Sequence, residues 1–373
     1  DRLADMPGLE AVYVIDGEPA DPNAMAELEK RGSLEPVPAY RPEPTEIATL
    51  IYTSGTTGDP KGVLLSHGNF TTNARAGYRL FKKQLDEDSV SFSILPWAHS
   101  FGQTAELYNW LQFGGRIGFM GGVDTLTDDL AAVAPTFLIA VPRIFNKIYD
   151  GIVAKMDAKG GMAQKLFDMG VETAREIREK GVEFVGVGSR LKFKLADAVV
   201  FKKIRALFGG RLKGALSGSA TMNVNIAYFF RDVGIPVYDC YGLSEMIGPG
   251  VGFECQEQDG LHIWNDNFLA EVLDENGEQV AEGEKGELVL TSLNKEGFCN
   301  IRYRTGDMTR LLESDCACGR TTTKISRLLG RVDDMLIVRG INVFPSQIQD
   351  VISRIPEVGE QFQLVLDRNK HML

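Results

Sequence analysis

Residues 47–62, IATLIYTSGTTGDPKG, place a β-rich apolar run directly before a loop of glycine, hydroxyl residues and lysine. Glycine lets the backbone approach a ligand closely and adopt positive φ. In an open α/β sheet, ligands gather at the carboxyl ends of the strands, where we expect this loop to lie. Backbone N–H groups, hydroxyls and Lys61 together predict an anion cradle suited to a polyphosphate. A flexible surface loop is the alternative, and the density of donors argues against it.

A short strand (11–16) and a proline-rich linker (34–44) are predicted before this run, and from there strand and helix patterns alternate along the chain. Apolar runs predict strands over 11–16, 47–53, 89–96, 136–141, 212–218 and 236–242. Helical patterns lie over 69–83, 99–113, 142–156, 162–180, 191–208 and 223–234. Thr125 or Thr127 is the expected N-cap of a further helix, and Pro142 suits a first helical turn. The alternation predicts an α/β fold with mostly parallel sheets flanked by helices. After about residue 250, an Asn-Gly turn between short strands predicts a β-rich subdomain of hairpins.

Composition sets limits on function. The chain has 373 residues, 44% of them hydrophobic and 24% charged, with a formal net charge of −11. This charge argues against a nucleic-acid partner, because phosphate binding requires a basic surface. Five cysteines in so long a chain indicate reduced thiols or a metal site rather than a disulfide framework. No apolar run has the length that spans a bilayer, so we expect a cytoplasmic protein.

The order of several motifs resembles the adenylate-forming family of acyl-CoA synthetases, nonribosomal adenylation domains and luciferases. Besides the loop, they are LPWAHSFGQTAE (95–106), VPRIFNKIYDGI (141–152), LSGSA (216–220), YGLSE (241–245), RYRTGD (302–307) and GRVDDMLIVRG (330–340). Up to about residue 245 the chain resembles long-chain fatty acyl-CoA synthetases, and after it phenylacetate-CoA ligases. The resemblance implies a large nucleotide- and acyl-binding domain over 1–332, incomplete at its N-terminus. A hinge and the truncated start of a small α+β domain follow over 333–373.

The resemblance also implies site residues for ATP, Mg²⁺ and coenzyme A (CoA). Thr53, Ser54, Gly55, Thr56, Thr57, Gly58 and Lys61 would surround the β- and γ-phosphates, and Gly218, Ser219, Ala220, Tyr241 and Gly242 the adenine and acyl groups. Ser244 would contact the α-phosphate, Glu245 would hold Mg²⁺, and Asp307 with Arg331 would bind the ribose. Thr53, Lys61, His99 and Glu245 are the expected catalytic residues, and Asp333 is the expected hinge. His99 would gate the acyl pocket; a packed or capping histidine is the alternative.

The implied chemistry is the ATP-dependent activation of a carboxylic acid, most simply a fatty acid. The ionised carboxylate is itself the nucleophile, so the site needs cations and donors more than a general base. CoA would then accept the acyl group as a thioester. The lysine that the family uses for adenylation lies beyond the end of this sequence, so we expect this chain to adenylate poorly.

Three other functions stay open. The first is a phenylacetate- or aryl-CoA ligase, since the later motifs resemble that branch. The second is an inactive nucleotide-binding fragment or a chimera of the two branches. The third is an adenylation domain that loads a carrier protein, against which the long helical stretch over 143–208 argues.

A cysteine–histidine set is a candidate zinc site. Cys255, His262, Cys316 and Cys318 supply three thiolates and an imidazole, which complete a tetrahedral site. The spacing is not that of a zinc finger, and three free thiols with a surface histidine are the alternative. Similar cysteines around a structural metal in some phenylacetate-type ligases favour the metal.

Residues 190–213 form a local basic segment in an acidic chain. They hold eight lysines or arginines and one acid, interleaved with Phe, Leu and Val. A solvated face of a packed helix, docking to anionic lipid and binding of CoA phosphates are three competing interpretations. A peripheral membrane contact through this segment therefore stays open as an alternative. A homodimer also stays open.

Overall fold

The computed structural model describes Gly8 and residues 11–18, 21–53, 61–122, 124–295, 299–332, 336–338, 341–343, 345–352 and 363–364. The chain divides into two compact units, residues 1–46 and 47–373. The first holds helix α1 (Met25–Leu34). The strand predicted over 11–16 is wrong, because this stretch makes only an isolated bridge between Val14 and Ala24. Its apolar side chains, such as Ile15 at 79% exposure, pack against no partner strand among the described residues.

The centre of the second unit is a parallel sheet. It contains β3 (Val90–Ser93), β4 (Arg116–Phe119), β5 (Phe137–Ala140), β6 (Gly214–Ser217) and β7 (Val237–Leu243). Their spatial order is β4-β3-β5-β6-β7, and every pair is parallel. The fold class predicted from the alternation of strands and helices is confirmed.

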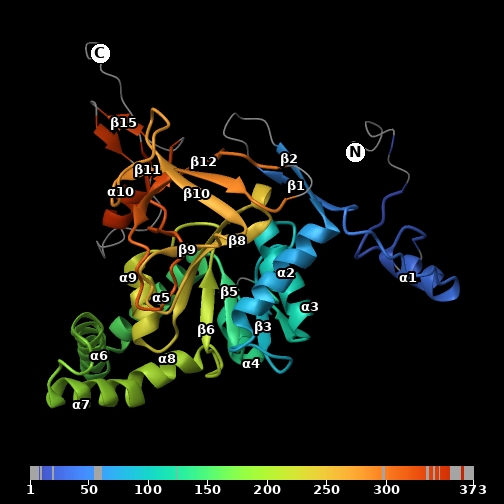
Figure 1. Ribbon diagram of the computed structural model, residues 1–373. Coiled ribbons are helices and arrows are strands. Elements are labelled where there is room, and N and C mark those ends of the chain that lie inside the picture. The colour runs from blue at the N-terminus through green and yellow to red at the C-terminus, as the bar shows by residue number, and fades with distance from the viewer. Residues whose placement is uncertain are drawn as a thin grey trace, which may run out of the picture. The chain divides into compact units, whose positions relative to one another are not determined.

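The same sheet continues as an antiparallel ladder beyond β7. Its strands are β8 (Gly248–Glu254), β9 (Leu261–Ile263), β10 (Phe268–Leu273), β11 (Lys285–Ser292), β12 (Tyr303–Leu312), β13 (Lys324–Ile325) and β14 (Gly330–Arg331). The pairing changes from parallel to antiparallel between β7 and β8. This ladder is the predicted β-rich subdomain (Figure 1).

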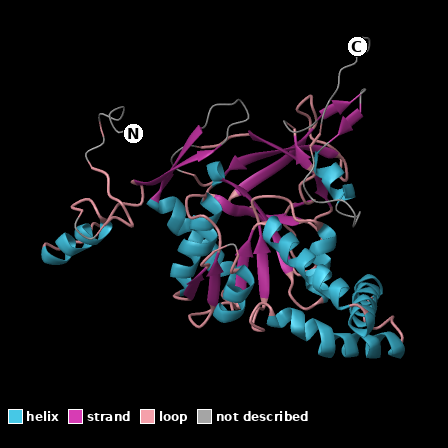
Figure 2. Ribbon diagram, turned by 180° about the vertical axis from the view of Figure 1, so that it is seen from behind, coloured by secondary structure: helices cyan, strands magenta, loops and turns pink. Residues whose placement is uncertain are grey.

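Helices lie on both sides of the strands (Figure 2). They are α2 (His67–Phe81), η2 (Gly102–Tyr108), α3 (Asn109–Phe113), α4 (Leu126–Val133), α5 (Pro142–Lys159), α6 (Gly161–Lys180), α7 (Val187–Ala196), η3 (Asp197–Phe201), α8 (Lys202–Ala206), α9 (Val224–Asp232) and η4 (Ser244–Met246). Pro142 begins α5 as predicted. Thr125 precedes α4, but its hydroxyl donates to Asp129 and caps no backbone N–H.

Strand β5 shows how the two helical layers share the sheet. Leu138 and Ala140 belong to the apolar core that contains Phe145 and Phe230 of α5 and α9. Phe137 and Ile139 belong to the core on the other side. Successive strand residues point to opposite faces, so a run that is buried at every position is what a sheet covered on both sides requires.

The run over 47–53 forms a strand as predicted, but its partner differs from the expectation. β1 (Ile47–Thr53) pairs antiparallel with β2 (Lys61–Ser66) in a sheet of their own, outside the parallel sheet. The short connection explains this, because parallel neighbours need a crossover of a dozen or more residues. Ser66 then caps α2 by accepting from the N–H of Asn69 at 3.2 Å.

The last described elements are β15 (Leu336–Val338), β16 (Ile341–Val343) and α10 (Pro345–Ile352). The first two pair as an antiparallel hairpin. Strands followed by a helix fit the predicted α+β start of a small domain. The domain boundary at 332 and 333 stays a prediction.

Candidate active site

A cavity of about 360 Å³ lies beside β7, where the sheet changes from parallel to antiparallel. Residues predicted to hold nucleotide line it from the loop after β6, the end of β7, and strands β12 and β14. They are Ser219, Ala220, Tyr241, Gly242, Asp307 and Arg331. The structure thus brings together side chains from motifs that lie far apart in the sequence.

Asp307 is the centre of the hydrogen bonds at this cavity. The Tyr241 hydroxyl donates to Oδ2 at 2.6 Å, and Arg331 Nη1 donates to Oδ1 at 3.0 Å. Burial, and next the negative charge of Asp307, raises the pKa of Tyr241 well above its ordinary value. The hydroxyl therefore keeps its proton and donates. Each carboxylate oxygen has two lone pairs, so a carboxylate accepts from several donors at once.

The loop after β6 brings bare backbone to the cavity. A Cβ at Gly218 would lie 2.7 Å from the Phe101 ring and 2.8 Å from Cys240 Sγ, so this position has room only for glycine. Ser219 adopts φ of +67°, a left-handed conformation that costs a side-chain-bearing residue free energy. Close packing and backbone strain meet at one edge of the cavity.

Glu245 has neighbours that the sequence did not predict. The Lys295 ammonium and Asn300 Nδ2, the latter at 3.2 Å, both donate to the backbone carbonyl of Glu245. Burial lowers the pKa of Lys295, and the Glu245 charge opposes that effect. Burial, and next the charge of Glu245 and a hydrogen bond to it, raises the pKa of Tyr303. The charge of Asp307 also raises the pKa of Tyr303, so the carboxylates of Glu245 and Asp307 both act on the Tyr303 hydroxyl.

Ser244 contacts Ser100, a residue that the sequence did not single out, and His99 lies next to Ser100 in the chain. The hydroxyl oxygens of Ser244 and Ser100 lie 3.0 Å apart and are buried. His99 Nδ1 accepts from the N–H of Phe101 at 3.1 Å, so His99 acts as a capping residue, which was the alternative to the gate. Burial lowers the pKa of His99 and favours the neutral ring, whose proton then lies on Nε2. The gating role stays a prediction.

Glu106 fixes the segment that carries His99. Its fully buried carboxylate accepts from the Ser93 hydroxyl at 2.6 Å, from the N–H groups of Ile94 and Leu95 at 3.2 and 3.3 Å, and from Trp97 Nε1 at 3.3 Å. Burial raises the pKa of Glu106, and these four donors oppose the shift. A lone acid inside a helical pattern gave no signal for this role.

Asp239 is a second buried acid that the sequence did not single out, and it lines the cavity beside β7. Its N–H donates to Glu254 at 2.8 Å, and Arg327 Nε donates to the other Glu254 oxygen at 2.7 Å. Burial, and next the charge of Glu254, raises the pKa of Asp239 to about 7. Two carboxylates thus share one guanidinium beside the cavity.

The phosphate loop is described only at its ends. Thr53 pairs with Lys61 in the β1–β2 register, and Lys61 is exposed. Ser54, Gly55, Thr56, Thr57 and Gly58 lie outside the described residues, as does Asp333. The core under the hairpin includes Ile247, two residues beyond Glu245, so the hairpin packs beside the η4 segment.

The four predicted metal ligands come together in space. Cys255, His262, Cys316 and Cys318 place one ligand atom each within 4.8 Å of all the others. The sulfurs of Cys255 and Cys316 lie 3.7 Å apart, and Cys318 Sγ lies 3.5 Å from His262 Nε2. A tetrahedron with zinc–sulfur bonds of about 2.3 Å and zinc–nitrogen bonds of about 2.0 Å has edges of roughly 3.8 and 3.5 Å. The donor set and its spacing therefore fit zinc.

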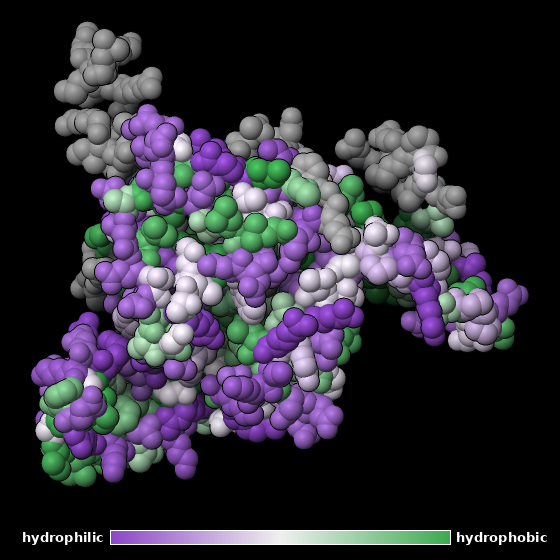
Figure 3. Space-filling view, viewed as in Figure 1, coloured by the Kyte–Doolittle hydropathy of each residue, from purple (hydrophilic) through white to green (hydrophobic). Residues whose placement is uncertain are grey.

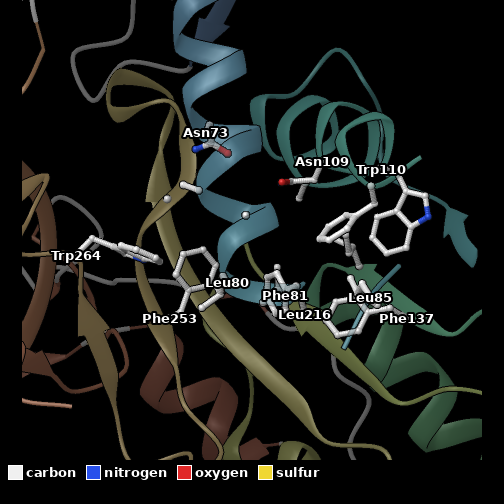
Figure 4. A pocket seen from close by; sticks show the side chains of 16 residues that line it. Asn73, Leu80, Phe81, Leu85, Asn109, Trp110, Phe137, Leu216, Phe253 and Trp264 are labelled. Carbon is white, nitrogen blue, oxygen red and sulfur yellow. The ribbon is translucent and has the colours of Figure 1, made fainter. Parts of the chain in front are cut away.

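A second, apolar cavity of about 30 Å³ lies between α2, α3 and the sheet. In Figure 4, Phe81 at the end of α2 and Leu85 in the following turn point toward Phe137 and Leu216 of the sheet, and Trp110 of α3 lies beside them. No lining residue carries a charge. The space is suited to an apolar group once its side chains move apart.

Comparison with known proteins places the chain in a family. The family model described as AMP-binding enzyme matches residues 2–294, and the model for the AMP-binding enzyme C-terminal domain matches residues 340–372. A phenylacetate-coenzyme A ligase of Thermus thermophilus is 50% identical over 138 residues, 36% of this chain and 31% of that protein. Long chain acyl-CoA synthetase 8 of Arabidopsis thaliana is 35% identical over 235 residues, 60% of this chain and 32% of that protein.

Solved structures support the same fold. An anthranilate CoA ligase in complex with anthranoyl-AMP aligns with a TM-score of 0.62 and 18% identity, over 95% of this chain and 60% of that one. At this identity the likeness shows the fold alone. The chain spans about a third of the length of the curated relatives that it matches.

Proposed function

The chain belongs to the AMP-binding enzyme family, and from this premise we propose that it activates a carboxylic acid with ATP and transfers the acyl group to CoA. The observation that carries the proposal is the cavity of about 360 Å³ beside β7, around which Tyr241, Asp307 and Arg331 form one hydrogen-bonded group. A buried carboxylate that is already oriented by two donors is suited to bind the paired hydroxyls of a ribose.

The site would work through charge and position. In the first step an oxygen of the substrate carboxylate bonds to the α-phosphorus of ATP, while the bond from that phosphorus to pyrophosphate breaks. In the second step the CoA sulfur bonds to the acyl carbon, and AMP leaves. Thr53 and Lys61, at the two ends of the phosphate loop, would hold the outgoing phosphates. Glu245 would hold Mg²⁺, which neutralises charge on phosphate oxygens.

Contacts to the backbone and side chain of Glu245 support its proposed role as the Mg²⁺ ligand. Lys295 and Asn300 fix its backbone, and Tyr303 contacts its carboxylate. A residue whose backbone and side chain are both held loses little conformational freedom when it binds a ligand, which favours precise positioning. We propose that Lys295 and Tyr303 position Glu245 rather than contact the substrate.

The acid substrate would place its tail in the apolar cavity of Figure 4. At about 30 Å³ the cavity does not hold a ring or a chain as it stands, so Leu80, Phe81 and Leu85 would have to move. A fatty acid is our first candidate, because the lining is mainly apolar and carries no charge. A phenylacetate-type acid is the second candidate, favoured by the 50% identity to the Thermus thermophilus ligase.

We also propose that Cys255, His262, Cys316 and Cys318 bind a structural zinc ion. The sulfur–sulfur and sulfur–nitrogen distances match the edges of a zinc tetrahedron, and four protein ligands leave no open position for a substrate. Structural zinc sites contribute stability to the fold directly.

Calorimetric titration of this chain with ATP and Mg²⁺ tests the nucleotide site. We expect binding heat for the wild type and affinity at least about 30-fold weaker for Asp307→Ala, because the hydroxyls lose charge-assisted partners worth about 2 kcal/mol together. Glu282→Ala, an exposed acid on the β10–β11 connection, is the matched control. Absence of heat for the wild type, or equal affinity in Asp307→Ala, would refute the proposed site.

Pyrophosphate release separates the candidate substrates. Laurate and phenylacetate are compared under the conditions in which ATP binds. Faster release with laurate supports the fatty acid, and faster release with phenylacetate supports the aryl acid. ATP binding without release from any acid would instead support the inactive nucleotide-binding fragment.

A further inference from the structure

Helix α7 and the η3 turn that continues it carry an exposed apolar stripe. Val187, Leu191, Leu195 and Val199 are 81%, 68%, 51% and 38% exposed. Each is four residues from the next, so at about 100° per residue they share one face of the helix. The opposite face packs against α6, where Ala196 is buried beside Gly170. The stripe therefore faces away from the core of the protein.

Positive charge borders the stripe. Lys192 and Lys194 are exposed, and by the same helical geometry they lie on either side of it. From Phe184 to Lys213 the sequence holds eight lysines or arginines and one acid, Asp197. That acid is paired with Arg205 at 2.6 Å. In a chain of net charge −11, this concentration of positive charge is local.

A cavity of about 250 Å³ adjoins the stripe between α5, α6 and η3–α8. Val199 belongs to both the stripe and the cavity lining, and the other apolar lining residues include Ile152, Leu166 and Ile204. Three lysines, Lys155, Lys159 and Lys203, also line it and are exposed. Figure 3 shows apolar and hydrophilic side chains side by side at the lower left, where Figure 1 places α6 and α7. The apolar stripe and the lysine-bordered cavity thus form one surface.

We infer that this surface, the α7 stripe with its lysines and the adjoining cavity, docks onto a lipid bilayer that contains anionic lipids. An apolar face bordered by lysines is the pattern of a helix that lies in the membrane interface. The lysines are complementary to anionic headgroups, and the cavity offers an apolar space that an acyl chain can enter. None of the helices among the described residues has both the length and the apolar character to cross a bilayer.

Other occupants fit the charge pattern less well. A second copy of the chain on a two-fold axis would place the lysines of one stripe against those of the other, which repels. A single amphiphile in the cavity would leave Val187, Leu191 and Leu195 exposed, because they lie outside the cavity lining. A lipid bilayer is an extended surface, so it covers both the α7 stripe and the cavity.

Vesicle flotation of the whole chain tests the inference, using phosphatidylcholine vesicles with and without phosphatidylglycerol. We expect stronger binding to the anionic vesicles, and weaker binding as salt is added. The pair Lys192→Glu and Lys194→Glu should weaken binding at least about 30-fold, since each basic residue near an anionic surface contributes about fivefold. The pair Leu191→Ser and Leu195→Ser should weaken binding to both kinds of vesicle.

Exposed positions on other elements provide matched controls. Leu269→Ser on β10 and Lys285→Glu on β11 should bind vesicles as the wild type does. Circular dichroism verifies that each variant is folded, which is expected because the altered side chains are exposed. Equal binding to neutral and anionic vesicles, no binding at low salt, or wild-type binding by the stripe variants would overturn the inference. So would a dimer in sedimentation that the stripe variants dissociate.

Discussion

Replacing Asp239 by asparagine should make the stability of the protein less dependent on pH. Asp239 is buried, and burial together with the charge of Glu254 raises its pKa to about 7. Its pKa in the unfolded chain is about 3.9. A raised carboxyl pKa means that the folded state binds the proton more tightly than the unfolded state does. The contribution of Asp239 to stability is therefore fully present below pH ~4 and is lost as pH rises through about 7.

The size of the effect follows from the two pKa values. The difference of about three pKa units, at about 1.36 kcal/mol each, gives a total loss of unfolding free energy of about 4 kcal/mol. Most of this loss falls within a pH range that suits unfolding experiments. Between pH 5 and pH 8 the wild type should lose roughly 2 to 3 kcal/mol of unfolding free energy through this group. The asparagine side chain of the variant cannot ionise, and without a second charge beside it Glu254 ionises more easily. Asp239→Asn should therefore be more stable than the wild type at pH 8.

Urea unfolding at pH 5 and pH 8 measures this difference. The control Glu282→Gln removes an exposed carboxyl and should leave the pH dependence of the wild type unchanged. If wild type and Asp239→Asn lose the same unfolding free energy between the two pH values, the pKa of Asp239 is not raised in the folded state, and the reasoning from burial is wrong.

Three further predictions concern the zinc site and the segment around His99. Cys316→Ser should lower bound zinc, measured by atomic absorption, from one ion per chain to a small fraction; a metal-free wild type would contradict the site. Glu106→Ala should cost about 3 kcal/mol or more of unfolding free energy, because buried donors lose their acceptor at about 1–3 kcal/mol each. Glu106→Gln should cost less, and equal costs would show that the acceptor is unimportant. Gly218→Ala should lower stability by about 1–3 kcal/mol, since its Cβ meets Phe101; an unchanged melting temperature would contradict the close packing.

Motifs in the sequence predicted much of the fold and the residues around the nucleotide cavity. The alternation of strand and helix patterns predicted a mostly parallel sheet, and β5, which is buried at every position, has the covered faces that such a sheet requires. YGLSE and RYRTGD supplied Tyr241 and Asp307, which lie in hydrogen-bond contact. Their partnership depends on strand pairing over long distances, so spacing along the chain alone did not predict it.

The errors have physical reasons as well. The run at 11–16 looks like a strand by composition, but a strand needs a partner, and none of the described residues supplies one. The 47–53 strand was predicted correctly, but its antiparallel partner follows from the short connection to Lys61 rather than from its apolar pattern. Glu106 and Asp239 went unnoticed because each is a single acid whose burial becomes apparent only in three dimensions.

The cysteine–histidine cluster and the nucleotide cavity share one antiparallel ladder. His262 on β9 pairs with Lys324 on β13, and β13 pairs with β12, the strand that carries Asp307. A slip of one residue in such a ladder turns every side chain to the other face. A metal that joins the turn after β8 to the turn before β13 would oppose that slip. We propose that a zinc ion bound there would help to keep Asp307 opposite Arg331 without contacting the substrate.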